Sequence, residues 1–214
     1  MSKRCCLLFL TLLLAAVTPS WAATPTWAAS MKEDSSSGRA GNWRRSVQGA
    51  PDLKVCAKKA EKEPQNAEAQ NDYGWALRQN GDLTEAEKYL RKAEALNSSL
   101  GYVHSNLSVV LLDQNKSEEA LAEAKKAVET DGKQPIYHVV LGNALFATDS
   151  VKPAISEYDA AVKLRPDYEN GYYNLGRALK KDGQVTEAKA ALSEALKLDP
   201  NDERVLKMLD ELLK

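Results

Sequence analysis

The chain repeats itself with a period of 34 residues between residues 67 and 202, in four consecutive copies without insertions or deletions. The copies are residues 67–100, 101–134, 135–168 and 169–202. A fixed period of this length is typical of an array of identical supersecondary units, in which each unit buries its apolar face only against its neighbours. Such arrays are surfaces that hold other molecules, and they seldom carry chemistry of their own.

Within each copy, two runs of apolar and small residues at helical spacing flank a short break. The residue at the break is Gly, Asn or Asp in every copy: Gly81, Asn115, Asp149 and Gly183. These residue types tolerate a left-handed backbone, which a tight stop between two helices requires. Each copy is therefore predicted to form two antiparallel helices, with Asp82 and Ser150 as N-caps of the second helix in the first and third copies.

Several stretches carry a family resemblance: NDYGWAL at 71–77, GDLTEA at 81–86, YYNLGRAL at 172–179 and ALKLDPN at 195–201. They resemble the tetratricopeptide repeat family. The resemblance implies an all-α fold, a right-handed superhelical α-solenoid of antiparallel helix pairs, with about four repeats. The fold hosts many unrelated partners, so it does not specify a function.

Both flanks of the array carry expected helices. Residues 203–214 place Val205, Leu206, Leu209, Leu212 and Leu213 on one stripe, which predicts a C-terminal capping helix over the last apolar face. Residues 51–65 are expected to form either an N-terminal capping helix or a worn half-repeat. They contain Cys56, for which burial is favoured over a disulfide between chains.

The N-terminal residues have a different character. Lys3 and Arg4 precede an apolar run from Cys5 to Val17, and the following segment, TPSWA at 18–22, offers small residues at the spacing that signal peptidases accept. Residues 1–22 are therefore expected to be a signal peptide, which predicts export to the periplasm or the extracellular space. Residues 23–50 are expected to be a disordered tether, and the mature chain is expected to have no membrane span.

Composition and residue spacing argue against nucleic-acid binding, metal binding and catalysis by this chain. The net charge is −1, which provides no field for nucleic acid. His104 and His138 occupy one column of neighbouring copies, too far apart to share a metal, and a packing or edge role is expected for both. Acidic residues such as Glu123 are interpreted as parts of solvated helix faces. No catalytic residue, metal site or cofactor is predicted, and the chain is not expected to be an enzyme.

By resemblance, the first helix of each repeat lines a concave groove that is expected to bind a peptide. The candidate groove residues are Asn71, Trp75, Tyr102, Asn106, Val109, Ile136, Val139, Asn143, Phe146, Tyr173, Asn174, Arg177 and Lys180. An asparagine amide can bond both the N–H and the C=O of an extended peptide, and Arg177 with Lys180 could hold an acidic or carboxylate group. Alternatively, the asparagines are simply common in the repeat and bind water.

These expectations favour a non-catalytic adaptor or scaffold of the cell envelope, which holds a peptide segment of a protein partner. The alternative is a self-associating structural component, or a non-catalytic subunit of an envelope assembly complex.

Overall fold

The computed structural model describes residues 52–214, and every regular element in this range is an α-helix. The helices are α2 (Leu53–Lys62), α3 (Ala67–Gln79), α4 (Leu83–Leu96), α5 (Gly101–Asp113), α6 (Ser117–Thr130), α7 (Pro135–Ala147), α8 (Val151–Leu164), α9 (Glu169–Lys181), α10 (Val185–Leu198) and α11 (Glu203–Leu213). The expected signal peptide and tether lie outside the described residues.

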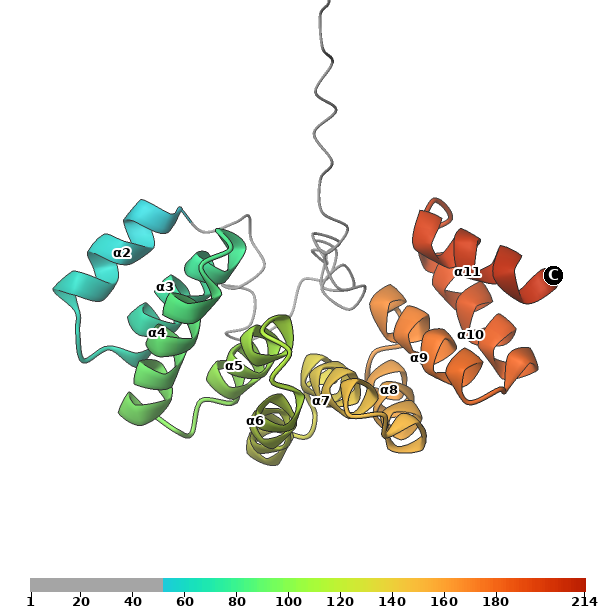
Figure 1. Cartoon of the computed structure of the whole chain (residues 1–214), viewed down its shortest axis with the longest axis horizontal. Helices are drawn as coiled ribbons and strands as arrows, with labels where there is room; N and C mark the ends of the chain where they lie inside the picture. The colour runs from blue at the N-terminus through green and yellow to red at the C-terminus, as the bar shows by residue number, and fades with distance from the viewer. Residues whose placement is uncertain (1–51) are drawn as a thin grey trace, which may run out of the picture.

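Each 34-residue copy contains one helix pair, and the copies match in detail. The first helix always has 13 residues and the second always has 14. The two helices of a pair pack against each other, and the second helix then packs against the first helix of the next copy. This arrangement confirms the predicted all-α solenoid of helix pairs (Figure 1).

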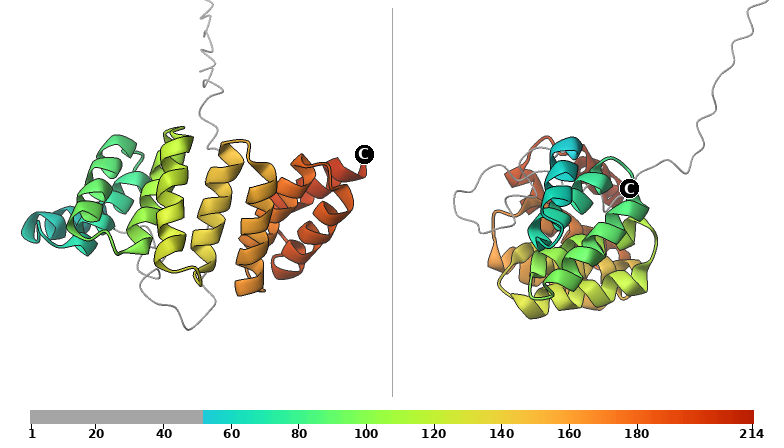
Figure 2. Two further views of the ribbon diagram at one scale, coloured as in Figure 1. Left: turned by 90° about the horizontal axis from the view of Figure 1, so that it is seen from below. Right: turned by 90° about the vertical axis from the view of Figure 1, so that its left-hand side faces the viewer.

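The pairs are arranged along an arc, with α2 at one end and α11 at the other (Figure 1). First helices also pack on one another across the repeats: α3 on α5, α5 on α7 and α7 on α9. This extra packing is expected on the inner side of a curved array, where neighbouring units are closest. The side views show the central pairs standing side by side as successive layers (Figure 2).

The turn inside each pair has the predicted left-handed residue. The backbone φ angle is 91° at Gly81, 61° at Asn115, 61° at Asp149 and 81° at Gly183. Glycine adopts this region without steric cost, and Asn and Asp are the other residue types that visit it most readily. The prediction from the break column is therefore confirmed in all four copies.

Asp82 and Ser150 occupy the predicted N-cap positions of α4 and α8, but their side chains do not cap the helices. Neither Asp82 nor Ser150 accepts a side-chain hydrogen bond from the first turn of its helix. Their ψ angles of 63° and 65° lie outside the extended range that a capping residue usually adopts. The Asp82 carboxylate instead accepts a hydrogen bond of 2.6 Å from the Nδ2 of Asn80, within the turn.

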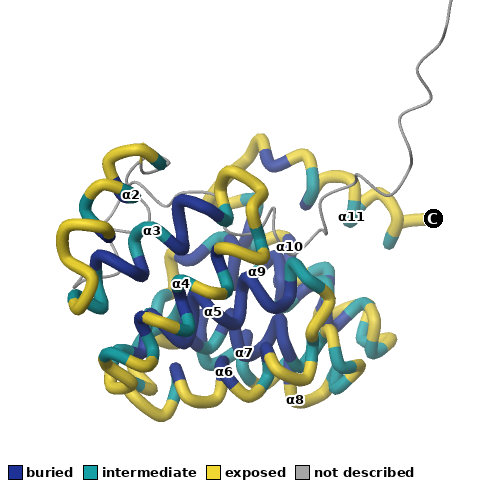
Figure 3. The backbone as a smooth tube through the Cα atoms, turned by 60° about the vertical axis from the view of Figure 1, so that its left-hand side comes forward, coloured by how far each residue is buried: buried dark blue, intermediate teal, exposed yellow. Residues whose placement is uncertain are grey.

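Small residues allow the helices of a pair to approach closely. A Cβ atom on Gly142 would lie 2.6 Å from Cε1 of Tyr158, on the partner helix. Ser108 occupies the same column and donates a hydrogen bond of 2.8 Å to the carbonyl of Ala120. The buried residues gather along α5, α7 and α9 (Figure 3). The centre of the array is therefore a continuous core between successive first and second helices.

Candidate functional site

The candidate groove residues differ widely in burial. Five retain partial exposure: Tyr102, Ile136, Phe146, Arg177 and Lys180. The other eight are buried: Asn71, Trp75, Asn106, Val109, Val139, Asn143, Tyr173 and Asn174. Val109 and Val139 belong to the hydrophobic core, at 1% and 0% exposure. As they are placed, these two valines pack helices together and offer no surface to a partner.

In the first two repeats, polar groups of the first helices bond one another. Nδ2 of Asn106 donates to Oδ1 of Asn71 at 2.9 Å, and Nε of Arg78 lies 2.6 Å from a carboxylate oxygen of Asp113. The Arg78 guanidinium also stacks over the Trp75 ring, 4.7 Å from its centroid. The asparagine and ion pairs join α3 to α5. The amides of Asn71 and Asn106, which were predicted to bind a peptide, therefore bond each other.

In the last two repeats, some buried polar atoms have no hydrogen-bond partner within the described residues. The hydroxyl of Tyr158 donates to Oδ1 of Asn143 at 2.8 Å, and Nδ2 of Asn174 donates to the carbonyl of Asn170 at 2.8 Å. Nδ2 of Asn143, Oδ1 of Asn174 and Nε of Arg177 are buried without a hydrogen-bond partner in the described part of the chain. Buried polar atoms are nearly always bonded, so unpartnered ones call for an explanation.

Phe146 is the partly exposed aromatic residue beside these groups. The Arg177 guanidinium lies 4.6 Å and the Lys181 ammonium 4.7 Å from the centroid of its ring, a cation–π arrangement. Lys181 also pairs with Asp149 at 2.6 Å, and Lys180 pairs with Glu211 of α11 at 2.5 Å. Glu211 therefore neutralises the positive charge expected at Lys180, and this ion pair was not predicted from the sequence.

The two histidines form the same pair of contacts in successive repeats. His104 and His138 each place Nδ1 on a glutamate of the second helix, Glu123 at 2.8 Å and Glu157 at 2.7 Å. Their Nε2 atoms each lie 2.9 Å from a backbone carbonyl in the preceding turn. The hydrogen bond to Glu123 raises the pKa of His104, although burial opposes this.

Sequence reasoning missed these histidine–glutamate pairs, because Glu123 was interpreted as part of a solvated face. It is buried, at 6% exposure. The signal that could have found the pairs is the identical separation of 19 residues between histidine and glutamate in both copies.

Among residues 52–214, no helix combines the length and the apolar composition needed to cross a bilayer.

Comparison with known families agrees with this architecture. Families described as tetratricopeptide repeat match residues 57–99 and 169–202, and one described as TPR repeat matches residues 142–183. The chain is a tetratricopeptide repeat protein. The matched regions cover most of the first and third copies and all of the fourth, and the second copy lies between them in phase.

Relatives and neighbours of this tetratricopeptide repeat protein have diverse descriptions. The mouse protein O-mannosyl-transferase TMTC3 is 28% identical over 152 residues, which cover 64% of this chain and 16% of the mouse protein. The chain spans less than a quarter of the length of the curated relatives that it matches.

Two solved structures share the fold and are described with peptides. YrrB, described as having an unusual peptide-binding site, has a TM-score of 0.60 at 21% identity, covering 76% of this chain and 92% of YrrB. The first repeat domain of Spaghetti (RPAP3), solved with the HSP90 peptide SRMEEVD, has a TM-score of 0.51 at 24% identity. That match covers 52% of this chain and 89% of the other. Some members of this fold therefore bind peptides.

Proposed function

We propose that this tetratricopeptide repeat protein is a non-catalytic adaptor that holds an extended peptide segment of a protein partner against its first helices. The observation that carries the proposal is the partly exposed ring of Phe146, with the Arg177 guanidinium 4.6 Å and the Lys181 ammonium 4.7 Å from its centroid. The unpartnered polar atoms of Asn143 and Asn174 are buried, at 2% and 0% exposure, so they do not face a peptide in this structure.

Phe146 supplies the apolar contact that would accompany such a peptide. Its ring is partly exposed, and the positively charged groups of Arg177 and Lys181 lie over it. The site therefore combines an aromatic surface with positive charge. A peptide with an acidic side chain or a free carboxylate fits this combination. The acidic HSP90 peptide bound to the Spaghetti repeat domain is consistent with the same chemistry on this fold.

We further propose that the protein acts in the cell envelope after export. The proposal rests on the character of residues 1–22, in which a short basic stretch precedes an apolar run and small residues. Expression of the full chain with a C-terminal tag, followed by fractionation and N-terminal sequencing, tests it. A chain that begins near residue 23 in the exported fraction is expected. A full-length chain in the cytoplasm would contradict export.

The groove proposal is tested with acidic peptides selected on the immobilised full chain by phage display, and then measured by fluorescence anisotropy. Phe146→Ala is expected to weaken binding by about tenfold or more, because truncation of a central aromatic contact commonly costs about 2 kcal/mol and about 1.4 kcal/mol is tenfold in affinity. The matched control is Val185→Ala, at an exposed apolar position of the second helix α10. Equal effects of the two changes, or none from Phe146→Ala, would contradict the groove.

Self-association is the second candidate, and sedimentation of the full chain decides it. An adaptor is expected to sediment as a monomer across the measured concentrations. A concentration-dependent dimer or larger species that Phe146→Ala abolishes would instead assign the same surface to a second copy of this chain.

A further inference from the structure

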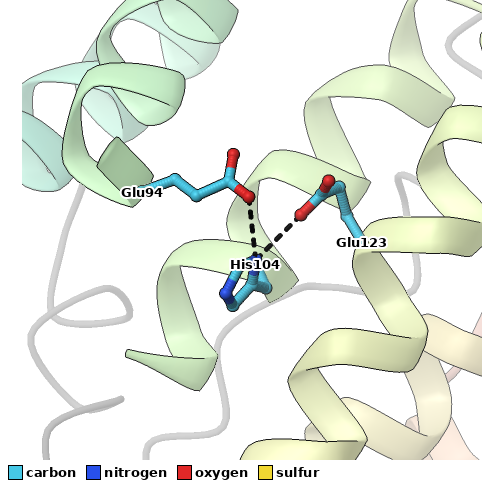
Figure 4. A group of neighbouring side chains, drawn as sticks. All are labelled: Glu94, His104 and Glu123. Carbon is cyan, nitrogen blue, oxygen red and sulfur yellow. Dashed lines mark hydrogen bonds and ion pairs between the residues drawn. The ribbon is translucent and has the colours of Figure 1, made fainter. Parts of the chain in front are cut away.

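Three titratable side chains from three helices converge at the junction between the first and second repeats. Glu94 comes from α4, His104 from α5 and Glu123 from α6, and their ligand atoms lie within 4.8 Å of one another (Figure 4). Nδ1 of His104 is 2.8 Å from Oε2 of Glu123 and 3.7 Å from Oε1 of Glu94. His104 and Glu123 are buried, and Glu94 is about one-fifth exposed.

Glu94 differs in residue type from the equivalent positions of the other repeats. The other three copies have apolar residues at this position: Val128, Val162 and Leu196. Those residues pack at the corresponding junctions, and Val162 is buried. A carboxylate in place of a packing residue costs apolar contact, so packing does not account for Glu94.

The contacts of His104 determine what its Nδ1 can do. Nε2 lies 2.9 Å from the carbonyl oxygen of Ser98, which only accepts, so Nε2 carries a hydrogen. Nδ1 then faces two carboxylates, and a positive species has to lie between them: a proton on Nδ1, or a metal ion bound by its lone pair. A histidine that donates its other ring N–H to a backbone carbonyl is the usual arrangement of a metal ligand.

We propose that Glu94, His104 and Glu123 form a binding site for a divalent transition-metal ion such as Zn²⁺. Tetrahedral zinc with bonds of about 2.0–2.2 Å places neighbouring ligand atoms about 3.3 Å apart. The two observed distances from Nδ1 of His104, 2.8 and 3.7 Å, lie on either side of this value, and all three ligand atoms lie within 4.8 Å of one another. An imidazole with two carboxylates suits zinc better than calcium or magnesium, which prefer oxygen ligands alone.

Lys126 is the counter-charge that such an ion replaces. Its Nζ lies 2.9 Å from Oε1 of Glu94 and 2.9 Å from Oε1 of Glu123. The side chain is 45% exposed, so the ammonium can move into water when the ion enters. A pocket of about 270 Å³ lies beside the cluster, with room for water to complete the coordination. Its lining residues are Glu94, Ser98, His104, Lys126, Glu129 and Thr130.

The third repeat provides a natural control. His138 and Glu157 repeat the histidine–glutamate contact, but Val128 occupies the position that Glu94 has at the junction between the first and second repeats. This pair lacks the third ligand and is not expected to hold a metal. The site would therefore tie the first repeat to the second and leave the next junction unaffected.

The test is isothermal titration of the full chain with zinc chloride at neutral pH, with circular dichroism of each variant to verify folding. One zinc ion bound per chain is expected for the wild type. Glu94→Val introduces the residue type of Val128 at the next junction and should weaken binding by more than about tenfold, since loss of even an outer-shell partner costs about 10–100-fold. Glu94→Gln keeps the side-chain shape and is expected to weaken zinc binding in the same direction, whether or not Glu94→Val folds.

Two further variants separate a metal site from an ion-pair network. Lys126→Ala should strengthen zinc binding, because it removes the competing cation, and His138→Ala should leave it unchanged. No zinc binding by the wild type, equal binding by wild type and both Glu94 variants, or an equal loss from His138→Ala and Glu94→Gln would overturn the proposal.

Discussion

At the scale of single residues, the four turns show how backbone conformation selects amino-acid type. Gly81 and Gly183 adopt φ angles of 91° and 81°, while Asn115 and Asp149 adopt 61°. A Cβ atom on Gly81 would meet nothing within 4 Å, so crowding by neighbours does not explain the glycine. The local conformation alone favours Gly, with Asn and Asp as tolerated alternatives.

Gly81→Val is therefore expected to lower the free energy of unfolding by about 1–2 kcal/mol, the cost of a left-handed backbone for a residue with a Cβ. Gly81→Asn is the matched control, because Asn115 already occupies the equivalent turn. It should lose only a small part of that amount. Urea unfolding of the two variants measures the difference, and equal stabilities would show that the turn is not strained.

At the scale of helices, the junction between the fourth repeat and α11 carries a charged cluster. Arg204 lies 3.2 Å from Glu169 and 2.6 Å from Asp202. Burial, together with the neighbouring Asp202 carboxylate, raises the pKa of Glu169 to about 7. Burial opposes the shift at Asp202, but hydrogen bonds from Arg204 prevail and lower its pKa to about 2.

These shifts predict how stability depends on pH. Glu169 binds its proton more tightly in the folded state, so its contribution is complete below its ordinary pKa of 4.5 and is lost as pH rises through about 7. The contribution of Asp202 is present above 3.8 and is lost as pH falls towards about 2.

Between about pH 5 and 7.5, the free energy of unfolding should thus decline by on the order of 2–3 kcal/mol, because the pKa of Glu169 rises from 4.5 to about 7 on folding and one pKa unit corresponds to about 1.4 kcal/mol. Urea midpoints measured across this range test the decline. Glu169→Gln should reduce the decline, and the part above about pH 6.5 that comes from the raised pKa of His104 should remain. An unchanged slope in that variant would assign the whole decline to other groups.

The helices and turns were predictable from the sequence, because they depend on spacing and residue type within one 34-residue copy. Contacts between copies were harder to predict from the sequence. Arg78 with Asp113 and Asn71 with Asn106 are each 35 residues apart, and both pairs depend on how one repeat is tilted on the next. The burial of Val139 depends on the same tilt. The candidate groove was therefore predicted as a row of positions, without its internal pairing.

At the scale of the whole molecule, the core extends along the array as successive clusters, so stability is distributed over the interfaces between neighbouring repeats. The buried clusters follow the chain: one joins the first three repeats, another lies between the third and fourth, and one joins α9 and α10 to α11. Local changes should therefore have local consequences.

Leu192→Ala, in the cluster under α11, is expected to cost about 2–5 kcal/mol of local stability because it leaves a cavity at a fully buried position. Hydrogen exchange should show lost protection in α9–α11, with protection retained in α5 and α6. Leu111→Ala in α5 is the comparison, and it should expose the central helices instead. Uniform loss of protection in both variants would indicate one cooperative unit.

The equal helix lengths in the four copies have a consequence for how this chain can change its size. One residue inserted within a helix rotates everything that follows by about 100°, which turns apolar faces out of register with the neighbouring repeat. A whole copy inserted between two others keeps the helices and turns in phase, because each pair begins and ends at equivalent positions. Changes of 34 residues therefore extend or shorten the arc by one helix pair, whereas a single residue added within a helix does not.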